Sequence, residues 1–174
     1  IFIKFILFPG LEIITGKTIP LSTVESCSMY HKYSIFYTFS NWWQDHDAKY
    51  SSLDLDKNTF NTFEFKNGLN KGDILLIIKK DYSEIRIGDI IAFEGNQKNP
   101  IIHRVIGIDI KNNEYIFSTI GDNNNGQLNV EKEINEKQVI GKVTFKIVPL
   151  LGWVKLIFYE HLKTREQRGF CSQN

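Results

Sequence analysis

The sequence predicts an all-β domain, built as a closed or partly closed barrel. From residue 71 onward the chain contains short segments rich in Ile, Val and Phe, separated by turns rich in Gly, Asn and Pro. Short strands with turn signals at this spacing are typical of all-β folds, whereas helices between the strands would indicate an α/β fold. The expected strands are residues 21–24, 73–79, 85–94, 101–110, 115–120 and 138–148.

Composition fits one folded domain. The chain has 174 residues, of which 42% are hydrophobic and 24% charged, and its net charge of +1 provides no basic face for a nucleic-acid partner. The cysteines, Cys27 and Cys171, show no metal-binding spacing and are too far apart in sequence to be interpreted as a disulfide framework. The four histidines are scattered, so the sequence predicts neither a metal nor a cofactor.

Residues 1–20 begin with an apolar run, IFIKFILF, that is too short to cross a bilayer. A span needs about 20 apolar residues. The run is therefore interpreted either as the end of a truncated membrane helix or as a buried first element of a soluble domain. The residues alone leave both interpretations open.

Residues 30–70 interrupt the β pattern and have no clear period of 2 or 3.6. We interpret them as an insertion with a short helix near Trp42. The pair Trp42-Trp43 could dip into a membrane interface or anchor the insertion onto the domain. Anchoring is favoured because tryptophan is most often buried for its large apolar area.

The C-terminal part changes from apolar to charged. Residues 150–159 are apolar and aromatic with one lysine, and they are expected to pack on the barrel or to lie on a membrane surface. The predicted organisation is thus an approach at 1–20, a β domain at 21–158 that contains the insertion, and a charged tail at 159–174.

The stretch STVESCSM, residues 22–29, places two hydroxyls two residues apart. Ser28 is the candidate nucleophile. A serine needs a base and a group that orients that base, and His103 and Asp122 are the candidates for these roles. Taken singly, each of these residues is more often a turn or core residue than a catalytic one.

The order of four short motifs carries more information than any single residue. After the serine box come Gly88-Asp89, His103-Arg104-Val105 and Gly121-Asp122-Asn123-Asn124. This order resembles the type I signal peptidases. The His-Arg pair, where bacterial members carry Lys-Arg, is similar to the archaeal and endoplasmic-reticulum branch.

The resemblance implies a membrane-bound serine endopeptidase that removes signal peptides from preproteins on the extracytoplasmic face. It implies Ser28 as nucleophile, His103 as general base, Asp122 as the orienting acid and the Ser26 hydroxyl as an oxyanion donor. Arg104, on the opposite face of a strand from His103, is expected to be structural. Membrane lipid is an implied partner, the run at 1–8 becomes the remnant of a membrane helix, and partner subunits stay undefined.

The chain departs from the family pattern at several positions. Cys27 and His31 stand where the family usually has Gly and Pro, and Gln127–Asn129 fill the region where it often has a second acid. A non-catalytic β domain with an assembly or binding role is therefore the alternative. A self-cleaving repressor domain would use a lysine base, and no lysine lies between residues 99 and 110.

Overall fold

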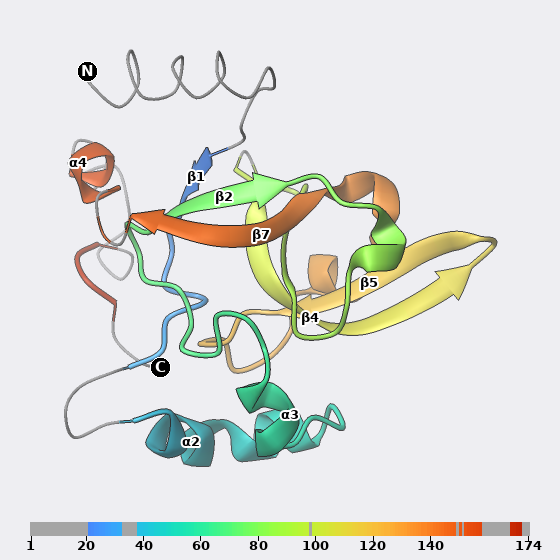
Figure 1. Ribbon diagram of the computed structural model, residues 1–174, viewed down its shortest axis with the longest axis horizontal. Helices are drawn as coiled ribbons and strands as arrows, with labels where there is room; N and C mark the ends of the chain where they lie inside the picture. The colour runs from blue at the N-terminus through green and yellow to red at the C-terminus, as the bar shows by residue number, and fades with distance from the viewer. Residues whose placement is uncertain are drawn as a thin grey trace.

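A computed structural model describes residues 21–32, 38–97, 99–148, 150, 152–157 and 168–171. Within these residues the strands form one antiparallel sheet of seven strands, in the order β1-β2-β7-β3-β4-β5-β6, which curls into a half-barrel (Figure 1). The strands are β1 (Leu21–Thr23), β2 (Ile74–Ile78), β3 (Ile90–Phe93), β4 (Ile101–Lys111), β5 (Glu114–Ile120), β6 (Ile134–Asn135) and β7 (Val139–Val148). The prediction of a mainly β domain is confirmed. Residues 1–20, 159–167 and 172–174 lie outside the described part, and with them the expected membrane-helix remnant and most of the tail.

Strand β3 is shorter than predicted, because a turn precedes it. The 3-10 turn η2 (Tyr82–Glu84) lies just before the segment expected to be extended, residues 85–94, and that segment itself begins with a second turn at residues 87–88. Gly88 then adopts a φ of +95°, a conformation that L residues with side chains rarely adopt. The Asp89 carboxylate closes this turn by accepting the Arg86 N–H at 2.9 Å. The extended backbone therefore begins only at Ile90.

Both faces of β3 are buried. Ile90 and Ala92 pack into one hydrophobic cluster with residues of β2 and β7, whereas Ile91 and Phe93 pack into a second cluster with residues of β4 and β5. Alternate side chains of a strand point to opposite faces. The continuous apolar run of β3 therefore lies between two hydrophobic cores. Because β3 pairs with β4, the burial of β3 also fixes the position of β4.

The insertion forms two helices, α2 (Phe39–Ser51) and α3 (Lys57–Asn61), which lie side by side below the sheet in Figure 1. The Asp56 carboxylate caps α3 by accepting the Thr59 N–H at 2.8 Å. A third hydrophobic cluster joins the helices to Ile106 of β4 and Ile120 of β5. Trp42 and Trp43 are 0% and 4% exposed within it, so the anchoring interpretation of this pair is confirmed.

The apolar C-terminal stretch buries only part of its side chains. Leu156, at the end of α4 (Trp153–Leu156), is 1% exposed, whereas Val154 and Ile157 are more than half exposed. One side of α4 is therefore buried and the other is exposed. No helix in the described part of the chain has the length and apolarity that a bilayer crossing requires.

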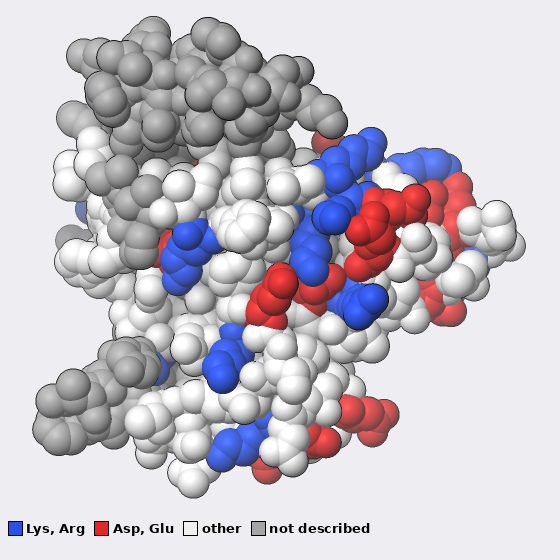
Figure 2. Space-filling view, viewed as in Figure 1, with Lys and Arg blue, Asp and Glu red and all other residues white. Residues whose placement is uncertain are grey.

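Charges of both signs are mixed on the face shown in Figure 2. Among the ion pairs of the described residues, Lys142 lies 2.8 Å from the Asp89 carboxylate and 3.6 Å from that of Glu64. Such alternation gives this face no field of a single sign that would attract a polyanion.

The third cluster should contribute strongly to stability. Trp42→Ala is expected to lower the free energy of unfolding by about 3–5 kcal/mol, because it leaves a cavity among fully buried rings. The matched control is Phe145→Ala, whose ring is 59% exposed and whose removal should change stability by about 0.5 kcal/mol or less. Urea unfolding of the two variants measures both values, and equal effects would contradict the anchoring role.

Candidate active site

The segment that follows β1 forms a tight turn around Ser28. The Tyr30 N–H donates to the Cys27 carbonyl at 3.1 Å, which closes the turn. The Asn123 N–H donates to the Ser28 carbonyl at 2.8 Å, and the Leu69 N–H donates to the Met29 carbonyl at 2.7 Å. The turn is therefore held by the end of the insertion on one side and by the segment after β5 on the other.

The structure brings Ser28, His103 and Ser26 together, as the sequence predicts. His103 is on β4 and 4% exposed, and its Nε2 lies 2.8 Å from the Ser28 Oγ. The Ser26 Oγ lies 3.0 Å from the same Ser28 oxygen. If the Ser28 hydroxyl donates to His103, its oxygen is left to accept the Ser26 hydroxyl proton.

The residue that orients His103 is Glu131, which the sequence analysis missed. Its Oε1 accepts a hydrogen bond from the His103 Nδ1. Glu131 ends the 3-10 turn η3 (Asn129–Glu131) and is fully buried, with its Oε2 accepting the Leu128 N–H at 2.6 Å. A carboxylate on Nδ1 leaves Nε2 without a proton, which is the tautomer that can accept one from Ser28.

The expectation that Asp122 lies within hydrogen-bond reach of His103 is wrong. The Asp122 carboxylate is fully buried on another network, where the Arg104 guanidinium binds it in a bidentate arrangement with a closest distance of 2.7 Å. Its oxygens also accept the Tyr50 hydroxyl at 2.9 Å and the His31 Nε2 at 2.8 Å. These donors occupy both oxygens of Asp122.

Arg104 is the centre of this second network, and the expectation that it is structural agrees with its contacts. It is 0% exposed, and besides Asp122 its guanidinium donates to the carbonyls of Glu64, Phe65 and Gly88. Alternation along β4 sends Arg104 to the face opposite His103. One strand therefore supplies both the candidate base and the residue that fixes the insertion.

Burial and neighbouring charges shift the pKa values of Asp122, His31 and Lys49. Burial alone would raise the pKa of Asp122, but the Arg104 charge and the His31 hydrogen bond outweigh it and hold that pKa well below its usual range. Burial lowers the pKa of His31 despite the hydrogen bond that its Nε2 donates to Asp122, so the neutral ring predominates at pH 7. Burial also lowers the pKa of Lys49 to about 8, and its ammonium donates to the carbonyls of Asp122 and Asn124.

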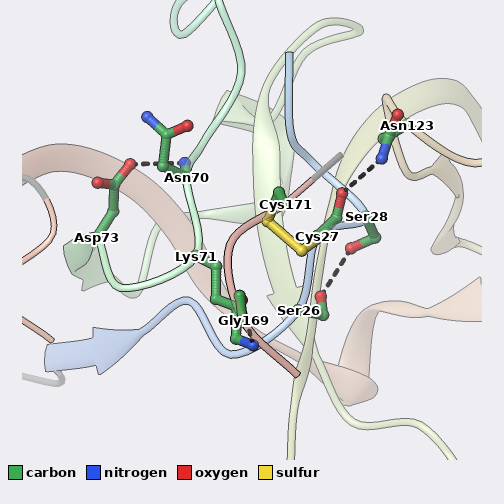
Figure 3. Close-up of a disulfide and its surroundings, with 9 residues drawn as sticks. All are labelled: Ser26, Cys27, Ser28, Asn70, Lys71, Asp73, Asn123, Gly169 and Cys171. Atoms are coloured by element: carbon green, nitrogen blue, oxygen red, sulfur yellow. Dashed lines mark hydrogen bonds between the residues drawn. A yellow bond between two sulfur atoms is a disulfide. The ribbon is translucent and has the colours of Figure 1, made fainter. Parts of the chain in front are cut away.

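The two cysteines form a disulfide, contrary to the sequence-based interpretation. Cys27 and Cys171 have Cα atoms 5.4 Å apart and are separated by 144 residues in the chain. Their bond lies directly beside Ser26 and Ser28 (Figure 3). A long sequence separation gives no information on spatial separation once the chain has folded, which is why spacing alone missed the pair.

No sequence motif pointed to Glu131 as the serine box pointed to Ser28 and the His-Arg-Val motif to His103. It lies nine residues beyond Asp122 in a polar stretch that contains Glu133 as well. Only the path of the chain after β5, through η3 and back to pair β6 with β5, places Glu131 rather than Glu133 at the His103 ring. Among the described residues no group of three His, Cys, Asp or Glu side chains is suited to a metal ion.

Comparison with known proteins finds relatives of the chain by sequence. A Candida albicans protein named signal peptidase complex catalytic subunit SEC11 is 30% identical over 98 residues, which are 53% of this chain and 58% of its own length. The rat protein named signal peptidase complex catalytic subunit SEC11C is 33% identical over 101 residues, or 54% of this chain and 52% of its own length. A Colletotrichum graminicola SEC11 is 32% identical over 103 residues, with 54% and 59% covered.

This chain is therefore similar to signal peptidase catalytic subunits over about half of its length. The chain spans about half the length of the curated relatives it matches. No protein-family model matches it, and no solved structure does. The resemblance to the endoplasmic-reticulum branch of the type I signal peptidases is thereby confirmed.

The buried network should make the fold sensitive to acid in two steps. His31 has a folded pKa below its ordinary value of 6.5, so the unfolded chain binds the proton first and stability falls as the pH drops below about 6.5. Asp122 has a folded pKa below 3.8, so its contribution is present above about pH 4 and is lost at lower pH. Urea unfolding between pH 7.5 and pH 3 measures both steps.

The variants for this experiment are His31→Gln and His46→Gln. Burial also lowers the pKa of His46, so this residue contributes to the first step in the same direction. His31→Gln should reduce the slope of stability against pH between pH 7 and pH 5, whatever its effect on stability at pH 7.5. An unchanged slope in His31→Gln would contradict the assignment.

Proposed function

We propose that this chain is the catalytic unit of a membrane-associated signal peptidase, a serine endopeptidase with a histidine base. The observation that carries the proposal is the Ser28-His103-Glu131 chain of hydrogen bonds, in which Ser28 and His103 belong to the motifs that resemble those of the signal peptidases. The relatives named signal peptidase complex catalytic subunit support the same activity.

In the proposed reaction, His103 Nε2 removes the proton from the Ser28 hydroxyl as the oxygen attacks the scissile carbonyl carbon. Glu131 stabilises the positively charged imidazole that results, and His103 then protonates the leaving amine. Water, activated by the same ring, hydrolyses the acyl-enzyme and regenerates Ser28. Each step requires the Nδ1–H to stay on the Glu131 side, which the buried carboxylate favours.

The oxyanion that forms on the substrate carbonyl needs hydrogen-bond donors. The Ser28 N–H and the Ser26 hydroxyl are the proposed donors, as the resemblance implies. In the structure the Ser26 hydroxyl already lies 3.0 Å from the Ser28 oxygen. A rotation about one side-chain bond would turn it from that oxygen to a substrate oxygen bound beside it.

The proposed substrate is an extended preprotein segment with a small residue at the cleavage site and another two positions before it. An extended peptide binds by adding a strand to a sheet edge, so alternate side chains enter pockets. In the described sheet β1 is an edge strand that leads directly into the Ser28 turn. Partner subunits and an extracytoplasmic position at a membrane are part of the proposal, and the name of the relatives as subunits of a complex supports the former.

Ser28→Ala tests the nucleophile. It should lower kcat for preprotein cleavage by about a thousandfold or more, because it removes the hydroxyl that contacts the His103 ring. Ser26→Ala should cost about a hundredfold, since it removes one oxyanion donor. Cleavage of a preprotein in lipid vesicles measures both, with circular dichroism to show that the variants fold. Retained cleavage by Ser28→Ala would exclude the mechanism.

Glu131→Gln and Asp122→Asn form a matched pair that separates the two carboxylates. Glu131→Gln presents an amide N–H to His103 and favours the wrong tautomer, so kcat should fall by about a thousandfold or more with little change in KM. Asp122→Asn breaks a buried ion pair, which should cost about 3–5 kcal/mol of stability. Its kcat, measured at a temperature where the variant is folded, should change much less. The reverse pattern would return the orienting role to Asp122.

A further inference from the structure

The Cys27–Cys171 disulfide joins the candidate nucleophile turn to a distant segment of the chain. Cys27 is the residue between Ser26 and Ser28, and Cys171 belongs to residues 168–171, which we call the C-terminal strap. Figure 3 shows the bond reaching the turn beside the Ser26–Ser28 contact. The disulfide is therefore attached to the residue that lies between the proposed nucleophile and the proposed oxyanion donor in the sequence.

The strap is attached to the domain by contacts of unequal strength. The ammonium of Lys71, which is 2% exposed, donates to the Gly169 carbonyl at 3.0 Å (Figure 3). The Phe170 ring contacts Trp153 with a centroid distance of 4.8 Å but is 81% exposed, so it buries little area. Lys71 and the disulfide thus fix the strap backbone on two sides of Phe170.

The turn itself is held on its other side by hydrogen bonds. Asn123 donates from its side chain to the Cys27 carbonyl at 3.1 Å and from its backbone to the Ser28 carbonyl at 2.8 Å. These bonds fix carbonyls, whereas the disulfide fixes the Cys27 side chain. The Cys27 backbone is therefore restrained by both the Asn123 segment and the strap.

We propose that the Cys27–Cys171 disulfide is a positioning element of the active site, so that the enzyme reaches full activity only in its oxidised form. The inference rests on the proposed peptidase function. Ser28 Oγ must stay in hydrogen-bond contact with His103, from which it lies 2.8 Å, and displacing a reacting group by about 1 Å can cost about a hundredfold in rate. Freeing the Cys27 side chain from the strap would permit such a displacement.

Interconversion of the oxidised and reduced forms is a thiol–disulfide exchange, which needs no metal. Dithiothreitol transfers two electrons and two protons to the disulfide, the S–S bond breaks, both cysteines become thiols, and dithiothreitol closes to its cyclic disulfide. Reoxidation passes the two electrons and two protons to a disulfide oxidant such as oxidised glutathione. Structural disulfides persist in oxidising compartments, which agrees with the extracytoplasmic position proposed above.

The test is a dithiothreitol titration of the protein in lipid vesicles, with kcat, KM and near-ultraviolet circular dichroism measured at each point. Reduction should lower kcat about 10- to 100-fold, change KM less than about threefold, and leave the dichroism of the folded domain in place. The control is the double variant Cys27→Ser with Cys171→Ser, whose lower activity should not respond to dithiothreitol. Unchanged kcat after full reduction would overturn the proposal.

Two single variants separate the covalent bond from the other strap contacts. Cys171→Ser should reproduce the kcat loss of the reduced wild type. Phe170→Ala keeps the disulfide and removes an exposed ring, so its kcat should stay within about threefold of wild type. If Cys171→Ser does not fold, or if activity and dichroism are lost together during reduction, the bond serves the fold and the positioning role is wrong.

A fluorophosphonate probe for reactive serines distinguishes failure of this inference from failure of the proposed function. The oxidised wild type should both cleave the preprotein and label at Ser28. Absence of both would reject the peptidase function and the inference with it. Equal labelling rates and equal cleavage by the oxidised and reduced forms would reject the positioning role alone.

Discussion

The buried ion pair between Arg104 and Asp122 is the interaction on which the arrangement of the site depends. Both residues are fully buried, and the pair is completed by two further donors to Asp122, the Tyr50 hydroxyl and the His31 ring, and by backbone carbonyls that accept from Arg104. A charge in an apolar interior is costly unless its partners are in place. The network therefore requires the insertion, the β4 strand and the segment after β5 to adopt their positions together, and those are the segments that hold the Ser28 turn and His103.

The insertion has a structural role in this arrangement that its irregular sequence does not suggest. Its aromatic cluster covers the Arg104 face of β4, and the Arg104 guanidinium lies 4.8 Å from the Phe60 ring. His31 stacks on Trp42 at 3.7 Å while it contacts Asp122. The departure at His31 from the usual family residue is thus explained by a partner that the insertion supplies.

The sequence predicted the longer strands well, because their apolar runs and turn residues are local signals, but it made β3 too long and missed the two-residue β6. It also predicted Ser28 and His103 as a pair, because the order of motifs is readable without knowing the fold. It assigned the wrong acid, since the choice between Asp122 and Glu131 depends on which face of β4 each carboxylate approaches. The disulfide was missed for a related reason: only the folded chain shows that Cys171 returns to the turn at Cys27.

The length of the disulfide loop has a consequence for the order of events during synthesis. Cys27 and Cys171 are 144 residues apart, so the bond cannot close until almost the whole domain has left the ribosome. By then the strands and the insertion have been made and can fold. The covalent link between the Ser28 turn and the C-terminal strap therefore forms only after the residues between Cys27 and Cys171 have been synthesised.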